Sequence, residues 1–89
     1  MNSYDVIVGS NNETGELELD RLISITSKYY DEYMVNPGVI SVNNGECENL
    51  AIVVVTSDES TLMIYMTELR TELNQREIAY RKAGEIKSL

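Results

Sequence analysis

The chain has 89 residues, of which 43% are hydrophobic and 25% are charged, and its formal net charge at pH 7 is −8. This length fits a single domain over residues 1–89, and the hydrophobic share suffices for one core and argues against disorder of the whole chain. The single cysteine, Cys47, excludes an intramolecular disulfide. A basic leader and a long apolar run are both missing, so we expect a cytoplasmic protein with no membrane partner.

The first half of the chain predicts a strand, a loop and a helix. Residues 4–8 form a short apolar strand that ends at Gly9, and a polar loop follows over residues 10–15. A helical period then covers about residues 18–33, and Asn36-Pro37-Gly38 is expected to stop that helix. The side chains of its apolar stripe are Leu19, Leu22, Ile23, Thr26, Tyr30 and Tyr33.

The second half predicts two strands, a helix and a last element. Residues 39–42 are read as a short strand, and Asn43-Asn44-Gly45 is typical of a hairpin turn. Residues 50–55 form a strand that is apolar on both faces, which indicates a central place in a sheet. A helix starts at Thr56, Ser57 or Asp58 and carries a buried stripe at residues 62, 66, 69 and 73. Residues 77–81 fit a strand slightly better than a continued helix, and residues 84–89 are expected to be a frayed tail.

The predicted order of elements is therefore β-α-β-β-α-β. This order is the split βαβ pattern of the ferredoxin-like α+β fold, in which two helices pack on one face of a four-stranded antiparallel sheet. The first and third strands are central in that arrangement. The strand at residues 77–81 is expected to lie beside the first strand.

Several stretches also resemble known proteins. Val6-Ile7-Val8-Gly9, the acidic start of the first helix, Tyr29-Tyr30 and the run from Leu69 to Gln75 are similar to small ferredoxin-like proteins of unknown function from bacteria and phages. The resemblance implies the fold and a phage setting, in which the protein would act in the cytoplasm of a bacterial host. It implies no catalytic residues.

The residue types exclude most catalytic chemistry. The chain has no histidine, so a Ser-His-Asp or Cys-His nucleophile system cannot form within it. The loop at residues 9–15 lacks the lysine of a phosphate-binding loop, and an EF-hand alignment of the same loop places Arg21 where the bidentate glutamate belongs. We therefore expect no enzyme activity, no cofactor and no metal. The third strand has no aromatic residue, which argues against direct nucleic-acid binding.

The acids are unevenly distributed along the chain. Residues 1–59 contain 11 acidic and 2 basic residues, a charge of −9, whereas residues 60–89 contain 4 acidic and 5 basic residues, a charge of +1. An acidic domain without catalytic groups suits a protein that binds a basic partner. The hypothesis is a phage-type inhibitor of a host nucleic-acid-handling defence complex, of the anti-CRISPR or anti-restriction class. The carboxylates expected to bind are those of Glu13, Glu16, Glu18, Asp20, Asp31, Glu32, Glu46 and Glu48.

Tyr29 lies off the buried stripe of the first helix, and we expect it to join this binding surface, because tyrosine offers a large contact area. The alternative hypothesis is a dimeric ferredoxin-like protein that binds a small molecule or is an enzyme, using carboxylates and tyrosines.

The apolar strands also predict self-association. Helices cover one face of such a sheet, so the other face is free to meet a second copy and form a homodimer. The third strand offers this free face either residues 50, 52 and 54 or residues 51, 53 and 55. The predicted interface consists of Val6, Val8, Ala51, Val53 and Val55.

Overall fold

The computed structural model of the chain describes residues 1–41 and 47–83, and it contains the six elements in the predicted order. They are β1 (Asn2–Gly9), α1 (Leu19–Tyr29), β2 (Tyr33–Ser41), β3 (Cys47–Ser57), α2 (Glu59–Glu72) and β4 (Ala79–Lys82). The predicted hairpin turn at residues 43–45 and the predicted frayed tail lie outside the described residues. Neither α1 nor α2 has the length and apolar character that crossing a membrane requires.

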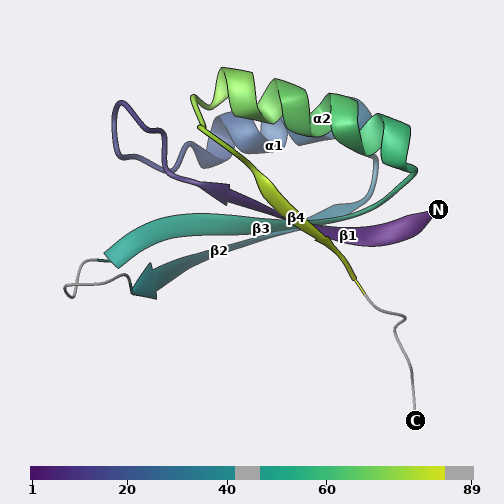
Figure 1. The fold of residues 1–89 in the computed structure, drawn as a ribbon, viewed down its shortest axis with the longest axis horizontal. Coiled ribbons are helices and arrows are strands. Elements are labelled where there is room, and N and C mark those ends of the chain that lie inside the picture. Colours follow the sequence, from purple (N-terminus) through teal and green to yellow (C-terminus); the bar gives the residue numbers. More distant parts are fainter. Residues whose placement is uncertain (42–46, 84–89) are drawn as a thin grey trace, which may run out of the picture.

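The strands form one four-stranded antiparallel sheet with the order β2-β3-β1-β4. The first and third strands are therefore central, as predicted. β4 pairs with β1 through Val6 and Tyr80, so the expected strand beside the first is confirmed, although it begins at Ala79. Figure 1 shows α1 and α2 on the same side of this sheet. The chain is a ferredoxin-like α+β domain.

The register decides which strand residues face the helices. Directly opposed residues of an antiparallel pair share a face, and successive residues of a strand alternate between faces. Val6 lies opposite Val53, and both are fully buried. The core beneath the helices contains, from the central strands, Tyr4, Val6, Val8, Ala51, Val53 and Val55.

This register corrects the predicted dimer interface. Val6, Val8, Ala51, Val53 and Val55 do share one face, but that face is the covered one, and each of them is at most 2% exposed. They pack against the helices and cannot meet a second copy of the folded chain. The uncovered side of the sheet, which we call the open face, carries Asp5, Ile7, Met34, Leu50, Ile52, Val54, Ala79 and Arg81, together with the polar residues Ser3, Asn36 and Thr56.

The boundary between α1 and β2 also differs from the sequence prediction. α1 ends at Tyr29, and Tyr30 is already extended, with φ −137° and ψ 135°. Tyr33 begins β2, and Asn36-Pro37-Gly38 lies inside this strand rather than ending a helix. Proline is tolerated there because β2 is an edge strand, where a missing backbone donor need not break a ladder hydrogen bond.

The helices bury apolar side chains together with polar groups that are hydrogen-bonded to each other. On α1 the buried side chains are Leu22, Ile25 and Thr26, whereas Ile23, expected on the buried stripe, is 42% exposed. On α2 the predicted stripe is buried, and Tyr65 joins it. The Tyr65 hydroxyl lies 2.7 Å from Thr26 Oγ1, which in turn donates to the Leu22 carbonyl at 2.7 Å. Burial raises the pKa of Tyr65 far above its ordinary value, so this hydroxyl remains neutral.

The N-cap of α2 is one of the three residues at which the sequence predicts the start of this helix. Asp58 is the N-cap, and its carboxylate accepts hydrogen bonds from the Thr61 backbone N–H at 2.8 Å and the Thr61 hydroxyl at 2.9 Å. These bonds favour the charged form, so the pKa of Asp58 lies below its ordinary 3.8. Asp58 therefore stabilises the fold above the unfolded-state pKa, and this contribution is lost as the pH falls through the lower folded-state pKa.

We expect the Asp58→Asn variant to keep the cap at neutral pH and to lose part of the acid sensitivity, because asparagine also caps helices but does not titrate. Its melting temperature should fall less than that of the wild type between about pH 5 and about pH 2. Thermal unfolding followed by circular dichroism measures this difference. Parallel pH profiles for the two proteins would contradict the assignment.

Candidate functional site

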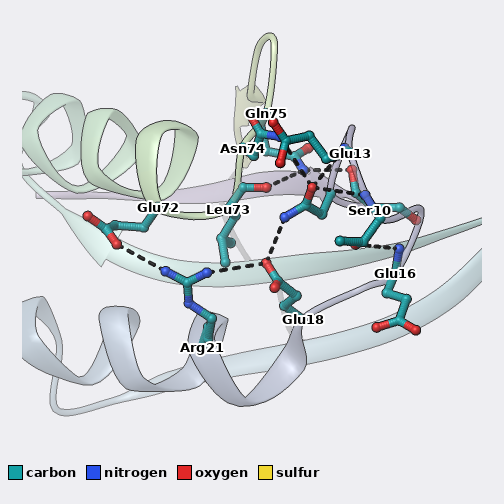
Figure 2. A network of polar contacts seen from close by, with 11 residues as sticks. Ser10, Glu13, Glu16, Glu18, Arg21, Glu72, Leu73, Asn74 and Gln75 are labelled. Atoms are coloured by element: carbon teal, nitrogen blue, oxygen red, sulfur yellow. Dashed lines mark hydrogen bonds and ion pairs between the residues drawn. The ribbon is translucent and has the colours of Figure 1, made fainter.

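The loop between β1 and α1 is shaped by one buried amide side chain. Asn11 is 8% exposed, and its Oδ1 accepts hydrogen bonds from the backbone N–H of Glu13 at 2.8 Å and of Thr14 at 3.3 Å. Its Nδ2 donates to Glu18 Oε2 at 3.2 Å, which ties the loop to the start of α1. Gly15 completes the turn with φ +73°, a conformation that favours glycine. Figure 2 shows how Glu16 projects from this loop.

Gln75 joins this loop to the segment that follows α2. Its Oε1 accepts from the Gly9 backbone N–H at 3.2 Å, and its Nε2 donates to the Ser10 carbonyl at 2.7 Å. β4 pairs with β1 only as far as Ile7, so the Gln75 amide takes the place of a neighbouring strand at the end of β1. Asn74 Nδ2 adds a bond to Asn11 Oδ1 at 3.3 Å. The loop is thus bonded both to the start of α1, through Glu18, and to the segment after α2, through Asn74 and Gln75.

Arg21, near the start of α1, is engaged in ion pairs. Arg21 lies 3.0 Å from Glu72 of α2 and 3.7 Å from Glu18, as Figure 2 shows. Glu18, expected to bind a partner, is therefore used inside the fold by Arg21 and Asn11. Its carboxylate holds the start of α1 in place.

Exposed carboxylates from four separate segments gather at this end of the sheet. We call them the acidic end: Glu13 and Glu16 from the loop, Asp20 from the first turn of α1, Glu48 from the start of β3, and Glu77 from the segment before β4. Ser10 Oγ donates to the Asn49 carbonyl at 3.1 Å, which places the start of β3 against the loop. A pocket of about 500 Å³ is lined by Asn11, Asn12, Asn49, Gln75, Glu48 and Glu77, among others. Arg76 is the exposed base beside this group.

The remaining acids predicted for the site are not at the acidic end. Asp31 and Glu32 follow the C-terminal end of α1, about 16 Å along the helix from its start. Glu46 lies outside the described residues. Glu77 was missed, although the predicted strand at residues 77–81 contained the necessary signal. A strand antiparallel to the first must begin near the end of the first, where the loop also starts.

Lys28 and Tyr29 both interact with Glu68 of α2. Lys28 Nζ forms an ion pair and hydrogen bond with Glu68, and the Tyr29 hydroxyl donates to the same carboxylate at 2.8 Å. The hydrogen bond from Lys28 and then that from Tyr29 lower the pKa of Glu68. The two bases of residues 1–59, Arg21 and Lys28, are thus both paired with acids of α2, and Tyr29 is a helix–helix contact.

The tyrosines serve the packing of the domain. Four hydroxyls are hydrogen-bonded inside the fold: Tyr29 to Glu68, Tyr30 to Ser57, Tyr33 to Ser27 and Tyr65 to Thr26. Among the described residues, no three His, Cys, Asp or Glu side chains are grouped so that they could hold a metal ion. The geometry therefore brings together carboxylates and amides on a surface, with no nucleophile–base pair beside them in the described part of the chain.

Comparison with known proteins gives the fold and no family. No family model matches the chain, and no curated protein matches it. Among solved structures it is similar to the de novo designed protein Foldit4, with a TM-score of 0.58 and 15% identity over 94% of this chain and 97% of that one. It is also similar to At3g17210 from Arabidopsis thaliana, with a TM-score of 0.56 and 10% identity over 98% of each chain. Likeness at these identities establishes the ferredoxin-like fold alone.

Proposed function

We propose that this chain is a small acidic protein-binding domain that occupies a basic surface of its partner through the acidic end. The observation that carries the proposal is the gathering of Glu13, Glu16, Asp20, Glu48 and Glu77 around a loop beside which Arg21 is held by acids of the fold itself, so that these five acids outnumber the exposed base Arg76 beside them. The loop is fixed by the bonds of Asn11 and Gln75. A loop whose backbone is fixed presents its exposed carboxylates together, and such a cluster of negative charge attracts a basic partner.

The narrower class that we propose is an inhibitor of a nucleic-acid-handling machine, such as a host defence complex inhibited by a phage protein. A groove that binds a phosphate backbone presents Arg and Lys side chains at the spacing of the phosphates. Clustered surface carboxylates can compete for such side chains. The size of the domain and its charge of −8 support this proposal.

A charge-neutralising triple variant tests the proposal. Replacing Glu13 and Glu16 with Gln and Asp20 with Asn should weaken binding to a deca-arginine probe roughly 3- to 100-fold, because each exposed charge pair contributes about 0.2–1 kcal/mol. Isothermal titration calorimetry measures the change. Binding by the wild type should also weaken when NaCl is raised from about 50 mM to about 300 mM.

The matched control removes the same charge from the opposite end of the domain. Asp31→Asn, Glu32→Gln and Glu59→Gln change residues that are exposed near the end of α1 and the start of α2. This control should bind as the wild type does, apart from the small effect of net charge. Equal losses in the two triple variants would show that only net charge matters and would reject the acidic end as the site.

A further inference from the structure

The open face of the sheet is apolar at its centre. Ile7 of β1 lies opposite Ile52 of β3, and both are only partly buried, as are Leu50 and Val54 on either side of Ile52. Met34 of β2 lies opposite Val54 and is 60% exposed. Both helices lie on the other side of the sheet (Figure 1), and among the described residues no element packs on these side chains.

The charges of this face balance each other. Asp5 and Arg81 are directly opposed on β1 and β4, and Arg81 Nε lies 2.8 Å from Asp5 Oδ2. The Asp5 side chain is 15% exposed, so this carboxylate is largely used within the pair. Glu48 stands only at the margin, two residues beyond Leu50 on β3. The centre of the open face is therefore neutral in a chain of net charge −8.

We propose that the open face is the interface of a two-fold homodimer, an inference that goes beyond the binding of a basic partner at the acidic end. A basic partner would find no unpaired carboxylate at the centre of this face, whereas a second copy offers it matching apolar side chains. Two-fold symmetry places one Asp5–Arg81 pair from each copy at the interface, and because each pair is neutral within its own copy, neither copy buries an unpaired charge. The neutral, apolar centre thus favours a second copy, whose face is equally neutral, over a charged partner.

The size of the face sets the strength of the dimer. Four strands about 4.8 Å apart and seven residues rising about 3.3 Å each span roughly 19 Å by 23 Å, a projected area of about 400 Å² per copy. A standard interface takes about 800 Å² of accessible surface from each partner, and a pleated face has more accessible surface than its projection. The interface therefore falls at the low end of specific interfaces, and we expect a dissociation constant on the order of 100 µM.

Sedimentation velocity of the full chain tests the proposal. Between about 10 µM and about 1 mM the mass should rise from 10.1 kDa towards twice that value. The dimer should tighten when NaCl is raised from about 50 mM to about 500 mM, because salt screens the repulsion between two chains of equal charge. This salt response is opposite to that of the acidic end, so failure of one proposal is distinguishable from failure of the other.

Two variants on the face and one elsewhere locate the interface. Ile52→Glu and Met34→Glu should each raise the dissociation constant at least about tenfold. Met34 is already exposed, so its replacement leaves the fold intact even if Ile52→Glu lowers stability. Ile64→Glu on α2, where the side chain is 60% exposed, adds the same charge on the helix side and should leave the dimer unchanged.

Other occupants of the open face would give other results in the sedimentation experiment. A chain that remains at 10.1 kDa throughout the concentration range overturns the proposal. A full chain that stays monomeric while residues 1–83 alone dimerise would mean that residues 84–89 occupy the face instead. A dimer that survives Met34→Glu and Ile52→Glu uses a different surface, which also overturns the proposal.

Discussion

The Val53→Asp variant is expected to be unfolded at room temperature. Val53 is fully buried between the helices and the centre of the sheet, opposite Val6 and Val35. An aspartate there must either bury a charge without a partner or become protonated, and either outcome costs several kcal/mol. The whole domain has a stability of only about 4–13 kcal/mol at its length. Far-ultraviolet circular dichroism and urea denaturation measure the loss.

The neighbouring Val54→Asp variant is the matched control. Val54 lies on the open face and is only partly buried, so the new carboxylate can remain hydrated. This variant should keep its secondary structure and lose the concentration-dependent dimer. If Val53→Asp folded normally while Val54→Asp unfolded, the assignment of the two faces would be reversed.

Replacing Tyr65 with alanine is expected to lower the free energy of unfolding by about 3–5 kcal/mol, the usual range for truncating a buried aromatic side chain. Tyr65 is fully buried, and its ring centroid lies 5.2 Å from that of Tyr30 and 5.6 Å from that of Tyr29. The substitution removes these contacts and leaves a cavity between the helices and the sheet. Urea denaturation with a constant slope measures the change.

Tyr65→Phe separates the ring from its hydroxyl. The Thr26 hydroxyl still donates to the Leu22 carbonyl, so the loss of the Tyr65 hydroxyl leaves no buried donor without a partner. We expect a loss of about 0.5–1.5 kcal/mol, far less than for alanine. Similar losses for the two variants would show that the hydroxyl, and not the packing of the ring, stabilises this part of the core.

The sequence predicts the order of elements and the order of strands because both depend on patterns that tertiary contacts do not disturb. The strand at residues 50–55 is apolar at every position, which placed it at the centre of the sheet, where it lies. The boundary after α1 was missed for a physical reason. Tyr30 is buried from an extended backbone, so it matches the helical period without being helical. Pro37 then suggested the end of the helix at a position that lies inside the edge strand β2.

The two faces of the sheet were grouped correctly but assigned to the wrong sides. Val6, Val8 and Val53 share a face, as the alternation required. Because β3 is apolar on both faces, it does not indicate which face the helices cover. The covered face could have been identified from β1, in which Ser3 and Asp5 alternate with Tyr4 and Val6. A polar residue at every second position marks the face that is not covered by helices.

The candidate site could be predicted only in part. The acids of the loop and of the first turn of α1 are local in sequence, so Glu13, Glu16 and Asp20 were identified. The Glu18–Arg21 ion pair is a local i,i+3 contact, whereas the use of Tyr29 by Glu68 depends on how α1 packs against α2. Tyr29 and Glu68 are 39 positions apart and Lys28 and Glu68 are 40 apart, and no local pattern indicates such contacts.

The assignment of the two faces is tested most directly by the methyl resonances of isoleucine in a dilution series. Ile7 and Ile52 lie on the open face, Ile25 lies in the core, and Ile64 is exposed on α2. Between about 1 mM and about 20 µM, the Ile7 and Ile52 methyl signals should shift together along one binding curve, because the dimer dissociates on dilution. The Ile25 and Ile64 signals should stay in place. Constant Ile7 and Ile52 signals, or shifts centred on Ile64, would contradict the account.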